Sequence, residues 1–185
     1  MAEIEIDLVE LEAEVTDEDH IKGAPDAPLT LVEYADYQCE ACILGYRAVE
    51  QLMETHGDRL RVVFRHFPLV SYHDMAMPGA LAADAAGIQG KFWEMHGKIF
   101  SAEGSFSEED LVGWAEEIGL DMDQFNRDRR SDELERRIRR VRLEGARSGV
   151  NGTPTFFLDN WRIDVMPTHE HLAAYVDHFL AHIDH

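Results

Sequence analysis

The stretch LTLVEYADYQCEAC, residues 29–42, carries the strongest signal for the fold. Its first six residues are apolar, β-branched or aromatic apart from one acid, Glu33, which is typical of a buried strand. After the second cysteine the apolar residues recur at helical spacing, and Gly57 is a usual helix end. The stretch therefore predicts a strand that leads into a helix, with Cys39 and Cys42 where the helix begins.

Cys39 and Cys42, separated by two residues, fit three kinds of site: half of a zinc site, a dithiol redox centre, or two buried small side chains. Their position favours the redox centre, because free N–H groups and the helix dipole stabilise a thiolate at a helix start. The thiolate is the form that attacks a disulfide, and a second cysteine one turn later can displace the bound substrate. A zinc site would need two further ligands from the histidines or acids.

The rest of the chain combines strand patterns with one long helical block. The expected elements are strands over residues 60–67, 155–158 and 161–165, and helices within residues 71–148 and over residues 169–183. Ser107 and Ser131 have the spacing of helix N-caps inside the block. Asp159-Asn160 suits the tight turn of a hairpin between the last two strands.

Four stretches make the sequence recognisable. They are residues 27–42, 64–69, 89–93 and 148–157. Through them the chain, from about His20 to Tyr175, resembles the DsbA-like thiol–disulfide oxidoreductases of the thioredoxin superfamily. The resemblance implies an α/β protein that has a thioredoxin fold with an inserted helical domain.

The expected organisation is an acidic N-terminal arm over residues 1–23, followed by a DsbA-like domain over residues 24–185. Its thioredoxin core comprises residues 24–70 and 149–185, and its helical insertion spans residues 71–148. The first 19 residues hold nine acids and no Lys or Arg, so we expect a loosely docked arm. A short edge strand is the alternative, because Ile4, Ile6 and Leu8 alternate with acids.

The resemblance also implies site roles: Cys39 is the nucleophile and Cys42 the resolving thiol. Thr153-Pro154 matches the family's cis-proline loop, which faces the cysteine pair, whereas the residues alone leave an ordinary trans turn open. Such a loop presents backbone groups to an extended substrate. The expected substrate-binding residues are Gly152, Thr153, Glu40 and Ala41.

Glu33 stands six residues before the first cysteine, where the resembling proteins place a buried acid behind the pair. A carboxyl group inside an apolar strand has a raised pKa, so it can take or give a proton as Cys42 reacts. The alternative is an exposed strand acid without a catalytic part. We expect the buried, catalytic role.

The net charge, the number of cysteines and the absence of long apolar runs limit the kinds of partner and location that we expect. With 37 acidic and 17 basic side chains the formal net charge is −20 at pH 7. That charge argues against nucleic acid or an anionic membrane as partner, since both need a basic face. Two cysteines exclude a multi-disulfide secreted scaffold. The sequence has no signal-peptide pattern and no run of 18 apolar residues, so we expect a cytoplasmic protein.

Two other clusters suggest binding sites. Six arginines between residues 136 and 147 fit a docking patch, but a solvated face that neutralises neighbouring acids is what we expect in so acidic a chain. Histidines near the C-terminus fit a metal site, but surface side chains are the simpler interpretation. They are His169, His171, His178, His182 and His185.

We therefore expect a thiol–disulfide oxidoreductase that acts on protein or peptide disulfides, with a thiol as electron donor or acceptor and no metal or organic cofactor. A cytoplasmic location favours reductase or isomerase work over net oxidation, because cytosolic thiols are kept reduced. One alternative is a peptide-binding module whose cysteines are incidental. Another is a glutathione-dependent transferase or isomerase of the same superfamily, a branch that usually lacks the cysteine pair.

Glu40 departs from the family pattern, which commonly has proline after the first cysteine. An anion beside Cys39 opposes thiolate formation, so the disulfide should be less oxidising than in strongly oxidising periplasmic members. The Glu40→Pro variant should therefore have a more oxidising reduction potential than the wild type, measured by equilibration with glutathione buffers. A proline variant that is no more oxidising would refute this expectation.

Overall fold

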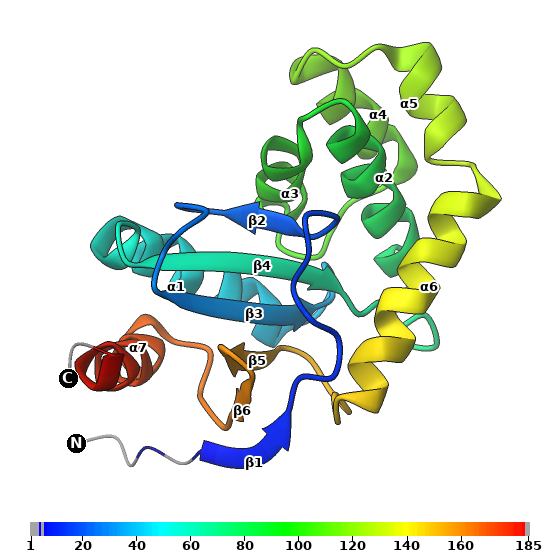
Figure 1. Cartoon of the computed structure of the whole chain (residues 1–185). Coiled ribbons are helices and arrows are strands. Elements are labelled where there is room, and N and C mark those ends of the chain that lie inside the picture. The colour runs from blue at the N-terminus through cyan, green and yellow to red at the C-terminus, as the bar shows by residue number, and fades with distance from the viewer. Residues whose placement is uncertain (1–3, 5, 184–185) are drawn as a thin grey trace.

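The computed structural model describes residue 4 and residues 6–183, and in this part of the chain six strands form one mixed sheet (Figure 1). The order of the strands across the sheet is β1-β6-β5-β3-β4-β2. β3 and β4 are parallel, and the other neighbouring strands are antiparallel. Helices pack on both faces of the sheet, which gives the α/β architecture expected from the sequence.

The elements have the following bounds. The strands are β1 (Ile6–Glu10), β2 (His20–Lys22), β3 (Leu29–Ala35), β4 (Leu60–His66), β5 (Thr155–Leu158) and β6 (Trp161–Ile163). The helices are α1 (Glu40–His56), α2 (Ala76–Ile88), α3 (Phe92–Ser101), α4 (Glu108–Glu117), α5 (Met122–Asp128), α6 (Asp132–Arg147) and α7 (His169–Ile183).

The central strand β3 is buried along its whole length. On one side β3 pairs with β4 in parallel, and on the other side it pairs with β5 in antiparallel orientation. Its side chains alternate between the two faces, because the side-chain period of a strand is two. Leu29 and Leu31 pack with α1 and α7, whereas Val32 and Tyr34 lie on the opposite face. There α6 comes so close that a Cβ at Gly145 would lie 2.7 Å from the Tyr34 ring.

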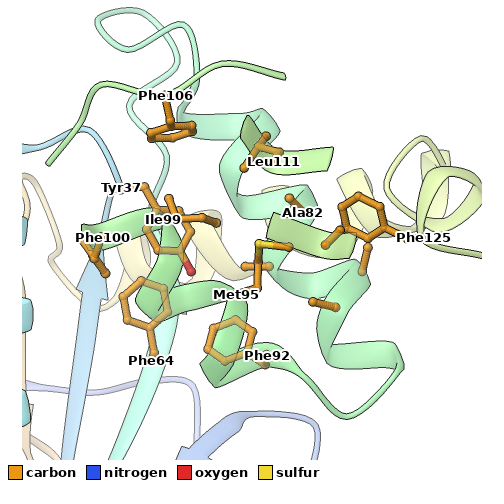
Figure 2. Close-up of a cluster of buried hydrophobic side chains, with 14 of the residues drawn as sticks. Tyr37, Phe64, Ala82, Phe92, Met95, Ile99, Phe100, Phe106, Leu111 and Phe125 are labelled. Carbon is orange, nitrogen blue, oxygen red and sulfur yellow. The ribbon is translucent and has the colours of Figure 1, made fainter. Parts of the chain in front are cut away.

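Helices α2 to α5 gather at one side of the sheet, next to β2 and β4, and α6 runs back from them past the sheet (Figure 1). One apolar cluster joins the two parts of the molecule (Figure 2). In it Tyr37 and Phe64, from the strand side, contact Phe92, Met95 and Phe100 of α3. Because burial of apolar surface drives folding, this cluster anchors the helices on the turn that precedes the cysteines.

The described part of the acidic segment is not the loosely docked arm that the sequence suggested. β1 pairs with β6 at the edge of the sheet, which is the alternative of a short edge strand, and β2 pairs with β4. The segment between β1 and β2 contains Asp19, and the buried Arg65 of β4 donates to both of its carboxylate oxygens, at 2.8 and 2.9 Å. Arg65 also donates to the carbonyls of Ala13 and Glu14, at 2.9 and 3.0 Å. A buried cation needs such partners, so the segment is held in place. Residues 1–3 and 5 lie outside the described part.

The helix starts agree with the sequence signals. Ser107 forms the predicted capping box with Asp110 at the start of α4, and Ser131 caps α6. The predicted hairpin is present as β5 and β6, and the last predicted helix as α7. Helix α5, whose first turn is capped by Asp121, was not expected as a separate element.

Two of the six clustered arginines of α6 pair with acids of the described part of the chain, as the simpler interpretation predicted. Arg139 pairs with Glu135 at 2.6 Å. Arg140 lies 3.5 Å from Glu18 and 3.8 Å from Glu144. Arg139 and Arg140 therefore neutralise carboxylates of their own helix and of the N-terminal segment, whereas Arg136, Arg137 and Arg142 donate to backbone carbonyls.

Two negative findings apply to the described residues. No helix among residue 4 and residues 6–183 is long and apolar enough to cross a membrane. The rings of His178 and His182 lie 4.4 Å apart, but no third metal-ligating side chain in the same part of the chain gathers with them. His185, also considered for a metal site, lies outside the described residues.

Candidate active site

Cys39 and Cys42 lie in the predicted place, where the chain passes from β3 into α1. Cys39 is the N-cap of α1, with an extended backbone (φ −74°, ψ 122°), and its carbonyl accepts a hydrogen bond from the Ile43 N–H at 3.1 Å. Both thiols are free; that of Cys39 is half-buried and that of Cys42 is fully buried. One thiol is therefore open to a substrate, and the other is shielded behind it.

The loop before β5 faces the cysteine pair. The peptide bond between Thr153 and Pro154 is cis, as the resemblance implied. The Cys39 thiol donates a hydrogen bond to the Thr153 carbonyl at 3.4 Å, across 114 residues of sequence. Gly152 belongs to the same loop and accepts a hydrogen bond from the Thr155 hydroxyl at 2.7 Å. Of the two residues between the cysteines, Glu40 is exposed and Ala41 is half-buried.

The environments of the two thiols move their pKa values in opposite directions. The pKa of Cys39 is lowered to about 6, chiefly by hydrogen bonding with the Cys42 side chain. Burial raises this pKa, whereas hydrogen bonds with Thr153 and with the Cys42 backbone N–H lower it further. The pKa of Cys42 is raised, first by burial and then by its interaction with Cys39. At neutral pH the half-buried Cys39 therefore favours the thiolate form, and the fully buried Cys42 the thiol form.

Glu33 is the buried acid that the sequence suggested, not an exposed one. It is 2 % exposed, and its pKa is raised to about 8, first by burial and then by the charges of Cys39 and Glu50. Its Oε1 has no hydrogen-bond partner among the described residues. Gly45 in α1 leaves room for it, because a Cβ there would lie 3.4 Å from Oε1. The carboxyl group is therefore poised to exchange a proton near neutral pH.

Asp36 is a site residue that sequence reasoning missed. Its backbone N–H donates to the Cys42 sulfur at 3.5 Å, and its buried carboxylate is the negative group that opposes ionisation of Cys39. That carboxylate accepts hydrogen bonds from the Leu69 backbone N–H at 2.7 Å and from the His73 ring at 3.0 Å. The position of Asp36 directly after the strand was the available signal, but two of its carboxylate partners, Leu69 and His73, lie more than thirty residues away.

Gln38, also missed, connects the cysteine turn to the helical part. Its side-chain oxygen accepts from the Met75 N–H at 2.7 Å, and its side-chain nitrogen donates to the Gly104 carbonyl at 3.1 Å. These contacts fix the residue before Cys39 between two loops of the insertion. They depend on the fold, and no pattern in the sequence marks them.

Metal ligation at the cysteines was one of the interpretations of the pair. Within the described ranges, no third Cys, His, Asp or Glu gathers with the two thiols closely enough to share an ion. The group of metal-ligating side chains found within these ranges is His20, His66 and Asp84, and it does not include either cysteine.

The family model described as Thioredoxin matches residues 15–178. Among solved structures, a thioredoxin-like oxidoreductase from Silicibacter pomeroyi superposes with a TM-score of 0.79 at 27% identity, covering 90% of this chain and 94% of that one. The thiol-disulfide exchange protein α-DsbA2 from Wolbachia pipientis gives a TM-score of 0.70 at 26% identity, with 80% of each chain covered. The thioredoxin-type fold and the DsbA-like family expected from the sequence are thereby confirmed.

The curated relatives are longer proteins. A Na⁺/H⁺ antiporter, NhaA 1 of Salinispora arenicola, is 42% identical over 151 residues, which are 79% of this chain and 22% of that protein. An antiporter of the same name from Mycobacterium is 39% identical over 146 residues, 24% of its length. The chain therefore spans about a quarter or less of the curated relatives that it matches.

Alkylation by iodoacetamide should reveal the lowered pKa of Cys39. The rate at Cys39, followed by mass spectrometry, should rise with pH, reach half its maximum near pH 6 and level off above, because only the thiolate reacts. The Cys42→Ala variant loses the interaction that lowers the pKa most, so its midpoint should move up towards the ordinary value of about 8.5. An unchanged midpoint in this variant, with an unchanged circular dichroism spectrum, would contradict the assigned cause.

Proposed function

The chain belongs to the Thioredoxin family, and on that basis we propose that it is a thiol–disulfide oxidoreductase acting on protein or peptide disulfides. One observation supports the proposal most strongly. The half-buried Cys39 at the start of α1 has a lowered pKa and contacts the Thr153 carbonyl, and the buried Cys42 behind it has a raised pKa. A reactive thiolate backed by a second thiol is what disulfide exchange requires.

In the first step the Cys39 thiolate attacks one sulfur of a substrate disulfide. A bond forms between Cys39 and that sulfur, the substrate's S–S bond breaks, and the other substrate sulfur leaves as a thiolate that takes a proton from water. Attack at neutral pH needs no base, because the pKa of Cys39 is already lowered to about 6.

In the second step Cys42 resolves the mixed disulfide. Once Cys39 is bonded to the substrate it carries no charge, so one of the causes that raise the pKa of Glu33 is removed and its carboxylate form becomes more favourable. Glu33 then accepts the proton of Cys42, and the Cys42 sulfur attacks that of Cys39. A disulfide between the two cysteines forms, the substrate thiolate leaves, and two electrons have passed from the protein to the substrate.

The cis-proline loop is proposed to hold the substrate. Thr153 already receives a hydrogen bond from the Cys39 thiol, and this bond is lost when Cys39 ionises. The carbonyl is then free for a backbone N–H of an extended polypeptide, in the manner of an added strand. Gly152 and Thr153 would line that strand on one side, with Glu40 and Ala41 beside the reacting sulfur.

The net direction of electron flow depends on the compartment. We propose a cytoplasmic location, in which the dithiol form would be regenerated by a cellular thiol donor and the protein would act as a reductase or isomerase. The same two steps run backwards when the oxidised pair meets a substrate dithiol, and then the protein oxidises its substrate.

Reduction of insulin tests the function and separates it from peptide binding. With dithiothreitol as electron donor the wild-type protein should accelerate insulin reduction, the Cys39→Ser variant should not, and the Cys42→Ser variant should accumulate a mixed disulfide visible on a non-reducing gel. These results follow because Cys39 forms the first bond and Cys42 breaks it. Equal rates for wild type and Cys39→Ser would instead favour a peptide-binding module with incidental cysteines.

The Glu33→Gln variant tests the proton transfer. Glutamine keeps the size of the side chain but accepts no proton, so the resolving step should slow by on the order of 100-fold while the first attack by Cys39 is retained. The measurement is rapid acid quenching of a single turnover, which separates the mixed disulfide from the final products. Glu54→Gln, which changes an exposed acid of the neighbouring helix α1, should resolve at the wild-type rate. Wild-type resolution in Glu33→Gln would remove Glu33 from the mechanism.

A further inference from the structure

His20, His66 and Asp84 come together on the side of the sheet that carries the helical insertion, apart from the cysteine pair. The Nε2 atoms of His20 and His66 lie 2.7 and 2.8 Å from the same oxygen, Oδ1 of Asp84. The three potential ligand atoms all lie within 4.8 Å of one another. The three residues come from β2, β4 and α2, so they are brought together by the fold and not by a local motif.

The three side chains are held by rigid surroundings. His66 and Asp84 have side chains only 5% and 3% exposed, and the His20 side chain is 17% exposed. The His20 ring stacks on Phe92, with ring centroids 3.6 Å apart and planes 5° from parallel. The His66 ring packs edge-on against Phe64, with centroids 5.3 Å apart. Side chains fixed in this way lose little freedom when they take up a common ion.

The cluster can be reached from solvent. A hollow of about 340 Å³ is lined by all three side chains together with parts of the N-terminal segment, β4 and α6. A second hollow, of about 1100 Å³, also reaches His20 and Asp84. An ion can therefore enter without opening the core.

We propose that His20, His66 and Asp84 bind a divalent transition-metal ion, with Zn²⁺ as the best match. Two imidazole nitrogens and one carboxylate oxygen are ligands that zinc takes, and imidazole favours zinc, cobalt and nickel over Mg²⁺ or Ca²⁺. In a tetrahedral zinc site neighbouring ligand atoms are about 3.3 Å apart, so both Nε2–Oδ1 distances widen by about half an ångström.

The ligand set leaves a fourth position towards the hollow. Each imidazole would bind the ion through Nε2, so its hydrogen bond to Asp84 Oδ1 would be given up and Nδ1 would hold the ring proton. Three protein ligands with a fourth, open position accept water or a small anion. The ion would tie the edge strand β2 and the end of β4 to α2, and so fasten the insertion to the sheet.

Zinc binding by the full chain tests the proposal, with the Cys39→Ser/Cys42→Ser double variant as parent because thiols also bind zinc. After treatment with a chelator, the parent should bind one equivalent of Zn²⁺ in a calorimetric titration and one of Co²⁺ with visible absorption bands. Adding His20→Gln or Asp84→Asn should weaken both by tenfold or more. Adding His178→Ala/His182→Ala, which removes the exposed histidine pair on α7, should leave both unchanged.

The outcomes separate a metal site from a purely structural hydrogen-bonded triad. No saturable zinc binding by the parent, or equal binding by the His20→Gln protein, would overturn the proposal and leave the triad as a set of hydrogen bonds. Loss of binding on removing the α7 pair would overturn it as well. His20 is the most exposed ligand, so His20→Gln decides the question even where Asp84→Asn does not fold. The test uses a parent without the thiols, so failure of the redox proposal does not affect it.

Discussion

The antiparallel pairing of β5 with the central strand β3 is the constraint on which the site depends. Tyr34 lies opposite Thr155 in that ladder, so the chain leaving β3 and the chain entering β5 emerge side by side at the same end of the sheet. Cys39 and Thr153 are therefore neighbours although 114 residues separate them in sequence. The burial of β3 on both faces keeps this register, because a shift by one residue would turn its apolar side chains away from their neighbours.

The positions of the two sulfurs and of the Glu33 carboxyl group follow from that register. The turn after β3 places one sulfur at the half-exposed start of α1 and the next sulfur one turn deeper. Hydrogen bonding with the Cys42 side chain lowers the pKa of Cys39, whereas burial raises the pKa of Cys42. Glu33 lies on the face of β3 that α1 covers, and Gly45 allows its carboxyl group to fit beneath the helix. The proposed nucleophile, resolving thiol and proton acceptor are thus positioned by one strand and one helix.

The features that depend on neighbouring residues in the sequence could be predicted from local patterns. Strand and helix periods, the cysteine spacing and the caps at Ser107 and Ser131 predicted most of the elements and the position of the cysteine pair, but not β2 or the separate helix α5. The buried state of Glu33 could be named only as one of two alternatives. The N-terminal segment was misjudged because its acids were counted as solvated charge, whereas one of them, Asp19, pairs with the buried Arg65. The group of His20, His66 and Asp84 has no local signal, since its members meet only through tertiary structure.

The reduction potential of the couple formed by Cys39 and Cys42, measured by equilibration with glutathione buffers, tests the central claim most directly. A stabilised thiolate favours the dithiol, and the pKa of about 6 lies just below that of thioredoxin, about 7, and well above that of DsbA, about 3.5. The expected potential therefore lies between about −270 mV and about −120 mV, nearer the former. A potential below about −300 mV, as in structural disulfides, or a pair that forms no disulfide, would contradict the account.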